Sequence, residues 1–179
     1  GTIRRSSATR PSGFPPRAAL PYLFLPMPIF SEKIGLASSV SSEISESIDI
    51  LERVRDENTP EKRISDNFSK TLASRISGTA PVVYGFGIYR AVSQRFKQQF
   101  NENSKVPSKW EFFPELSHNE IVGWEAAKEL AGCFSTIFIR GHDEPDEMQQ
   151  RIEVTKELVR RESVKVFEVW SMGESRLAK

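Results

Sequence analysis

The stretch APVVYGFGIYRAVSQRFKQQF, residues 80–100, decides the fold, because the spacing of its apolar residues changes partway along it. Its opening β-branched and aromatic run, residues 80–84, predicts a short buried strand. Gly85 and Gly87 follow at once and predict a tight turn. Apolar residues then recur every fourth position, at Val92, Phe96 and Phe100, and predict a helix over residues 89–100. A strand that passes directly into such a helix is typical of a crossover between parallel strands.

The same alternation of strand and helix continues along the chain. Further strands are predicted at residues 110–113, 134–140 and 164–170. Helices are predicted between them, at residues 119–130 and 147–161. Helical connections of this length join parallel strands and cover both faces of a sheet. The sequence therefore predicts an α/β fold: a three-layer α/β/α domain with a mostly parallel sheet.

Helical sequence precedes this domain. Three prolines exclude one regular helix after residue 17, namely Pro21, Pro26 and Pro28. We therefore expect a short broken or kinked helix there, ended by Gly35. An amphipathic helix is predicted next, over residues 44–55, because apolar residues recur at spacings of three and four.

A second amphipathic helix is predicted over residues 60–76, with Thr59 as its cap and Pro60 as its first helical residue. Residues 173–179 are predicted to begin a further helix. The expected organisation is an irregular N-terminal segment, a helical connecting segment and the α/β domain, over residues 1–16, 17–78 and 79–179.

Composition bounds the class of protein. The chain has 179 residues, which is enough for one domain of ordinary size. Its 25 basic side chains nearly balance 24 acidic ones, and the net charge of +1 gives no electrostatic reason to expect nucleic acid or an anionic membrane as a partner. The longest apolar run, residues 18–30, is too short to span a membrane and contains three prolines.

Cysteine and histidine usage gives no indication of a metal site. Cys133 is the one cysteine, so the chain has no disulfide framework, and a cytoplasmic location is expected. Together with His118 and His142 it offers no recognisable spacing of metal ligands. We expect neither a metal nor a cofactor.

Gly85 and Gly87 lie between a strand and a helix, where backbone N–H groups can hold a phosphate. Arg90 stands where the dinucleotide-binding fingerprint needs a third glycine, so a nucleotide-binding fold is not expected. Two interpretations stay open. The glycines contact a substrate at the carboxyl end of the strand, or they only permit a tight turn.

Glu102 follows the helix over residues 89–100 and lies between Asn101 and Asn103. Carbonyl dipoles gather at the end of a helix and disfavour a carboxylate there, which suits a general base that takes up and releases protons near neutrality. The alternative is an ordinary solvated loop acid between two turn-forming asparagines.

His118 follows the strand over residues 110–113 and is predicted to stand at the start of the next helix. Imidazole titrates near neutrality and can shuttle a proton to a sugar ring oxygen, whereas the alternative is a capping or surface histidine. Glu102 and His118 are expected on loops at the same edge of the sheet, which favours a joint catalytic role. Arg17 is a candidate to stabilise an anion, and its alternative is an exposed arginine at a helix start.

Three segments together resemble one enzyme family: PPRAALPYLF (residues 15–24), GFGIYRAVSQRFKQQFNENSKVP (residues 85–107) and PELSHNEIVGWE (residues 114–125). They resemble the bifunctional phosphoglucose/phosphomannose isomerases of the sugar isomerase (SIS) superfamily. The most specific feature is the pairing of F-N-E-N-x-K with P-E-x-x-H-N, which sets Glu102 and His118 at a fixed separation.

The resemblance implies an aldose–ketose isomerase that has two SIS domains in tandem, forms a homodimer and uses no metal. Such enzymes interconvert glucose 6-phosphate, or mannose 6-phosphate, with fructose 6-phosphate through a cis-enediol. By matching positions, Glu102 would be the base that moves a proton between C1 and C2. His118 would assist ring opening across the dimer interface, and Arg17 would stabilise the enediolate.

The chain also departs from the family pattern. The phosphate-binding loops of the first SIS domain, around S-Y-S-G-N-T, have no match here, and the family continues beyond the position of Lys179. We therefore expect a connecting segment and a truncated C-terminal SIS domain, without the N-terminal SIS domain and with little activity alone. The alternatives are an SIS module that binds a phosphosugar without chemistry, and a module that only dimerises.

Overall fold

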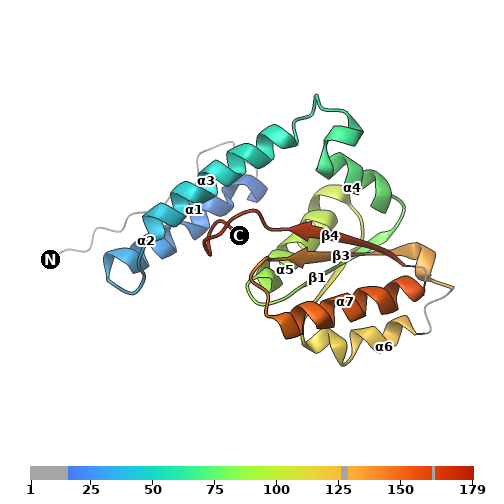
Figure 1. Ribbon diagram of the computed structural model, residues 1–179. Helices are drawn as coiled ribbons and strands as arrows, with labels where there is room; N and C mark the ends of the chain where they lie inside the picture. Colours follow the sequence, from blue (N-terminus) through green and yellow to red (C-terminus); the bar gives the residue numbers. More distant parts are fainter. Residues whose placement is uncertain (1–15, 126–128, 163) are drawn as a thin grey trace. The chain divides into compact units, whose positions relative to one another are not determined.

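The computed structural model of the chain describes residues 16–125, 129–162 and 164–179 (Figure 1). The chain divides into two compact units. The larger comprises Val54–Met172 and contains the sheet, and the smaller comprises Gly1–Arg53 together with Gly173–Lys179. The predicted boundaries after residues 16 and 78 stay predictions about the domain organisation.

A sheet of four parallel strands forms the centre of the larger unit, in the order β2-β1-β3-β4. The strands are β1 (Ala80–Gly85), β2 (Lys109–Phe112), β3 (Phe134–Arg140) and β4 (Lys165–Trp170). Each begins and ends within one residue of its predicted range. Every connection between them contains helix, as crossovers between parallel strands require.

Helices cover both faces of this sheet. In chain order they are α4 (Phe68–Ile76), α5 (Tyr89–Gln99), α6 (Glu120–Trp124) and α7 (Asp146–Arg161). Alternate residues of β1 belong to different apolar clusters: Val83 packs with α4 and α5, whereas Val82 and Tyr84 pack with α6 and α7. A strand buried on both faces reads as a continuous apolar run, as β1 does. The predicted three-layer α/β/α fold with a parallel sheet is confirmed.

The smaller unit is helical. A short 3-10 turn (Pro16–Ala19) leads into α1 (Leu20–Phe24), α2 (Pro26–Lys33) and α3 (Val40–Glu57), the last of which continues into the larger unit. Pro21 and Pro26 stand in the first turns of α1 and α2, where a missing N–H leaves no helical bond unmade. Gly35 follows α2 with a φ of 77°, a conformation that favours glycine. The predicted interruption by proline and the stop at Gly35 are confirmed.

The predicted helix over residues 60–76 is wrong in its first half. Turns and a short 3-10 segment (Ile64–Asp66) occupy that half, and α4 begins at Phe68. Asn67 caps α4, because its Oδ1 accepts from the N–H of Lys70 at 2.8 Å. Its Nδ2 donates to the carbonyl of Thr59 at 3.1 Å, so the buried asparagine holds the preceding loop as well.

The predicted helix over residues 119–130 is also too long. α6 ends at Trp124, and the chain later forms a 3-10 turn (Ala131–Cys133). Residues 126–128 of the prediction, including Ala127, lie outside the described residues. Gly123 lowers helix propensity inside α6, and the short helix is held by burial of Trp124.

Residues 173–179 form turns and bends, so the predicted start of a helix there is wrong. Three of their backbone N–H groups donate to side chains of α3 instead. Glu46 accepts from Glu174 at 2.7 Å and from Ser175 at 3.2 Å, and Glu43 accepts from Leu177 at 3.1 Å. Carboxylate acceptors compete with the intrahelical carbonyls for these donors.

Candidate active site

Glu102 lies on a π-helical turn, η3 (Phe100–Ser104), which continues α5 directly. The turn closes with the N–H of Val106 donating to the carbonyl of Phe100 at 3.2 Å, and Lys105 takes a left-handed conformation. Glu102 is exposed, and no described residue hydrogen-bonds or pairs with its carboxylate. Single π-turns of this kind occur often at functional sites. The turn therefore presents an acid that is available for proton transfer.

His118 is exposed immediately after a 3-10 turn, η4 (Glu115–Ser117). Its backbone N–H donates to the carbonyl of Glu115 at 2.9 Å. Asn119 links the two sides of this turn, because its Nδ2 donates to Glu115 at 3.2 Å and its Oδ1 accepts from the N–H of Glu120 at 2.5 Å. The histidine is thus exposed on a backbone that is fixed by hydrogen bonds.

Glu102 and His118 do not lie at the same edge of the sheet, and that expectation is wrong. The turn that carries Glu102 leads into the amino end of β2, whereas His118 follows the carboxyl end of the same strand. A helix that connects parallel strands runs back across the sheet, so its C-terminus reaches the amino edge. The four residues of β2 separate the two turns by roughly 13 Å along the strand.

Arg17 lies in the 3-10 turn (Pro16–Ala19) and is exposed. It belongs to the smaller unit, whereas Glu102 and His118 belong to the larger one. Its role in a site shared with them stays a prediction.

Gly85 is buried, and close packing accounts for a glycine there. A Cβ at this position would lie 2.5 Å from the carbonyl oxygen of Tyr89 and would also collide with Ser93. Gly87 is exposed and has a φ of 56°, which favours glycine in the turn. Packing and turn geometry explain both glycines without a ligand, and their contact with a substrate stays a prediction.

We expect the Gly85→Ala variant to lose about 2 kcal/mol of unfolding free energy, because the backbone of α5 would have to move away from β1. Gly123→Ala is the matched control, since a Cβ there meets nothing within 4 Å and alanine favours the helix. Urea unfolding of the two variants should give changes of opposite sign. Equal stabilities would show that packing does not require glycine at position 85.

The crevice between the ends of β1 and β3 is filled by a side chain. Ligands of open parallel sheets bind at the point where the strand order reverses, and here that point lies between these two strands. Tyr89 is 3% exposed, its hydroxyl donates to Ser171 Oγ at 2.9 Å, and its ring lies where a Cβ on Gly141 would be. The side chain of Tyr89 therefore fills this crevice.

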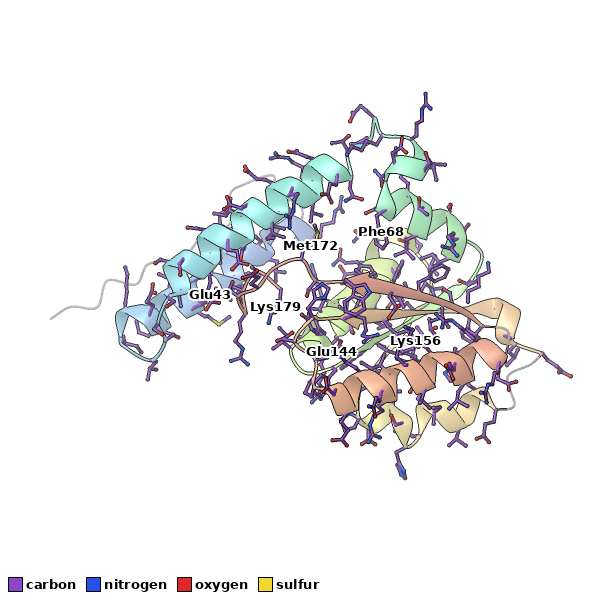
Figure 2. All side chains as sticks on the ribbon, viewed as in Figure 1. Glu43, Phe68, Glu144, Lys156, Met172 and Lys179 are labelled. Carbon is purple, nitrogen blue, oxygen red and sulfur yellow. The ribbon has the colours of Figure 1, made fainter. Side chains whose placement is uncertain are left out.

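Sequence reasoning missed a buried charge network at the carboxyl end of β3. Arg140 is 2% exposed, and its guanidinium contacts Glu144 at 2.7 Å, Glu153 at 2.9 Å and Glu168 at 2.7 Å. Lys156, also buried, contacts Glu153 at 2.7 Å and Glu168 at 2.8 Å. Figure 2 labels Glu144 and Lys156, which come from the loop before α7 and from α7 itself. The one sequence signal was an arginine at the end of an otherwise uncharged strand.

The pKa directions of Arg140 and Glu153 both favour the charged form of the side chain. Burial lowers the pKa of Arg140, but hydrogen bonds to Glu144 and Glu153 outweigh it and raise that pKa above its ordinary value. Burial raises the pKa of Glu153, but hydrogen bonds from Lys156 and Arg140 outweigh it and lower that pKa below 4.5.

Other kinds of site find little support in the described residues. No group of three or more His, Cys, Asp or Glu side chains among them could hold a metal ion. Nor does that part of the chain contain a helix long and apolar enough to cross a membrane. A pocket of about 200 Å³ between α4 and β4 is lined by Phe68 and Phe167 among others, and neither Glu102 nor His118 lines it.

The parallel sheet with helices on both faces defines a doubly wound α/β domain. Residues 65–179 match the family model described as the bacterial phospho-glucose isomerase C-terminal SIS domain, and the chain belongs to that family.

Known relatives agree with this assignment. The chain is 37% identical over 174 residues to a bifunctional phosphoglucose/phosphomannose isomerase of Caldicellulosiruptor bescii, covering 96% of this chain and 51% of the relative. It is 28% identical over 169 residues to an enzyme of the same name from Aquifex aeolicus, covering 94% and 48%. The chain thus spans about half the length of these relatives.

A solved structure shares the fold. The crystal structure of a glucose-6-phosphate isomerase like protein from Thermus thermophilus matches 80% of this chain and 48% of its own, with a TM-score of 0.66 and 22% sequence identity. At this identity the match supports the architecture alone.

Proposed function

We propose that this chain is the C-terminal half of an aldose–ketose isomerase that interconverts glucose 6-phosphate or mannose 6-phosphate with fructose 6-phosphate. One observation carries the proposal: an exposed carboxylate, with no partner among the described residues, and an exposed imidazole lie on ordered turns at the two ends of β2, in a chain of this family. Isomerisation needs a base that gives back the proton it takes, and no redox group.

In the proposed reaction Glu102 takes the proton from C2 of the open-chain aldose and returns it to C1 through a cis-enediol. The electron pair of the broken C2–H bond forms the enediol double bond, while the former carbonyl oxygen on C1 gains a proton. The hydroxyl on C2 then loses its proton as C2 becomes the carbonyl of the ketose, and the proton held by Glu102 completes the new C1–H bond. His118 donates to the ring oxygen during ring opening, and Arg17 stabilises the negative charge on the enediolate oxygen. The proton count is the same before and after, so no further reactant is needed.

We further propose that the site is assembled from two copies, one giving Glu102 and the other His118. Their location at opposite ends of β2 supports this, because one copy alone separates them. Many large apolar side chains of the smaller unit are exposed, which supports a contact with another domain or copy. They include Leu23 (70%), Met27 (60%), Phe30 (62%), Leu36 (78%) and Leu51 (65%).

The phosphate of the substrate is expected to bind to a further SIS domain. The Ser- and Thr-rich loop of the family has no match in this sequence, and Tyr89 fills the crevice of the domain described above. Remote phosphate binding holds the reacting carbons in place, so we expect little turnover from these 179 residues alone.

Mixing two inactive variants of the complete two-domain enzyme tests the shared site. Glu102→Gln and His118→Gln should each lower turnover strongly. A one-to-one mixture, dissociated and reassembled, should regain about a quarter of the wild-type activity, because half of the dimers are mixed and one of their two sites is intact. The activity is measured by following the conversion of fructose 6-phosphate spectrophotometrically.

The outcomes separate the parts of the proposal. Two inactive variants that do not complement each other would overturn the shared site and leave the isomerase standing. Two fully active variants would overturn the catalytic roles of Glu102 and His118. Phosphosugar binding by such active-site variants, with no turnover in the wild type, would favour the alternative of an SIS module without chemistry.

A further inference from the structure

The exposed turn around His118 is held between two anchored residues. Leu116, two positions before the histidine, is fully buried and belongs to the apolar cluster beneath α6 and α7. Glu120, two positions after it, begins α6 and has a side chain only 12% exposed. A glutamate at a helix start is usually solvated, so this low exposure calls for specific partners.

A chain of hydrogen bonds supplies those partners. Trp124 Nε1 donates to the hydroxyl of Tyr84 at 3.0 Å, and that hydroxyl donates to Glu120 Oε1 at 3.2 Å. The other carboxylate oxygen of Glu120 pairs with Lys109 Nζ at 2.5 Å. β1, β2 and α6 are thereby joined through one carboxylate.

Tyr84 is suited to hold that carboxylate. It is fully buried in β1, and its ring meets Phe138 edge to face with centroids 5.2 Å apart. Burial raises the pKa of Tyr84 well above 10, and the charge of Glu120 raises it further, so the phenol keeps its proton and stays a donor. Its single hydroxyl accepts one bond and donates another, and removing it would leave both partners one bond short.

We infer that Tyr84 and Glu120 are positioning residues for His118: the buried hydroxyl fixes Glu120, and Glu120 fixes the turn that carries the imidazole. Asn119 completes the link, because its side chain accepts from the N–H of Glu120 and donates to Glu115 on the other side of the histidine. The inference rests on the proposed function, since it concerns how the proposed catalytic histidine is held. Neither residue is expected to touch the substrate.

Tyr84→Phe tests the inference, with Tyr89→Phe as its matched control. Both tyrosines are nearly completely buried and each donates one hydrogen bond, but Tyr89 packs on the opposite face of the sheet and bonds to Ser171. Each variant loses the same single atom. An effect of Tyr84→Phe alone therefore reports on the bonds of this hydroxyl to Glu120 and Trp124, both in α6, rather than on the loss of a buried tyrosine hydroxyl in general.

Nuclear magnetic resonance gives a readout that does not need activity. The chain has two histidines, and His142 is distinguished by stacking on Trp170 with ring centroids 5.0 Å apart. Tyr84→Phe should shift or broaden the imidazole signal of His118 and leave that of His142 in place. Amide exchange within α6 should become about fivefold faster, the factor that corresponds to one ordinary hydrogen bond. Tyr89→Phe should do neither.

In the complete enzyme, Tyr84→Phe should lower kcat by about tenfold and leave KM unchanged, because a misplaced catalytic group weakens the chemical step and not substrate binding. If Tyr84→Phe does not fold, Glu120→Gln is the second variant for the same measurements. Glu120 lies near the surface, so its substitution disturbs the core less. An unchanged His118 signal, or equal effects of both phenylalanine variants, would overturn the inference. An inactive wild type with a shifted His118 signal would overturn the proposed function and leave the positioning role intact.

Discussion

The Glu102→Gln variant of the complete two-domain enzyme should lose at least about a hundredfold in kcat, because the amide cannot take a proton from the substrate. Binding of fructose 6-phosphate, measured by calorimetry, should change by less than about threefold, since glutamine keeps the shape of the side chain and most binding energy comes from the phosphate. The same variant should also stop transfer of the hydrogen on C2 of the aldose to C1 of the ketose, followed with substrate that carries deuterium at C2.

Glu157→Gln is the matched control for this experiment. Glu157 is an equally exposed acid on α7 and is not part of the proposed site. Its loss should leave kcat unchanged. Persistent turnover by Glu102→Gln, with the control unchanged, would show that Glu102 is not the base of the reaction.

The Arg140→Met variant should lose about 3 to 5 kcal/mol of unfolding free energy, because it leaves Glu144 buried without its cation. Arg151→Met, on α7, should lose less than about 0.5 kcal/mol, since Arg151 and Glu147 are exposed and 3.9 Å apart. Denaturant unfolding measures both. Similar losses from the two variants would contradict the assignment of Arg140 to a buried network.

A second substitution separates the loss of packing around Arg140 from the cost of a buried carboxylate that has lost its cation. Adding Glu144→Gln to Arg140→Met should restore part of the lost stability, because the uncompensated buried charge is then removed. If the double variant is as unstable as the sum of the single ones, the cost lies in packing and not in charge.

Lowering the pH should reduce the difference in unfolding free energy between the wild type and Arg140→Met. The pKa of Glu153 is lowered in the folded state, so its contribution to stability is present above the ordinary value of 4.5 and is lost as the pH falls through the lower folded value. If the difference in unfolding free energy between the two proteins grows below pH 4.5, this account is wrong.

Local patterns predicted the larger unit well. Each strand begins and ends within one residue of its predicted range, because runs such as the one at residues 80–84 are buried on both faces and need continuous apolar sequence. Two helices and the C-terminal segment were predicted poorly. α4 starts at a buried asparagine cap, and three N–H groups of residues 173–179 donate to carboxylates of α3. No local period of apolar residues reveals either contact.

The sequence by itself determined the order of elements, the parallel sheet and the family resemblance carried by Glu102 and His118. It did not determine that these two residues lie at opposite ends of β2, since that depends on the direction in which α5 crosses the sheet.

Only the tertiary structure brought Arg140 together with Glu168 and Tyr84 with Glu120, which stand 28 and 36 positions apart in the chain. Helix periodicity and strand alternation describe neighbours within a few residues. A buried charge or hydroxyl costs free energy unless it is paired, and its partner can come from any part of the chain that the fold places next to it.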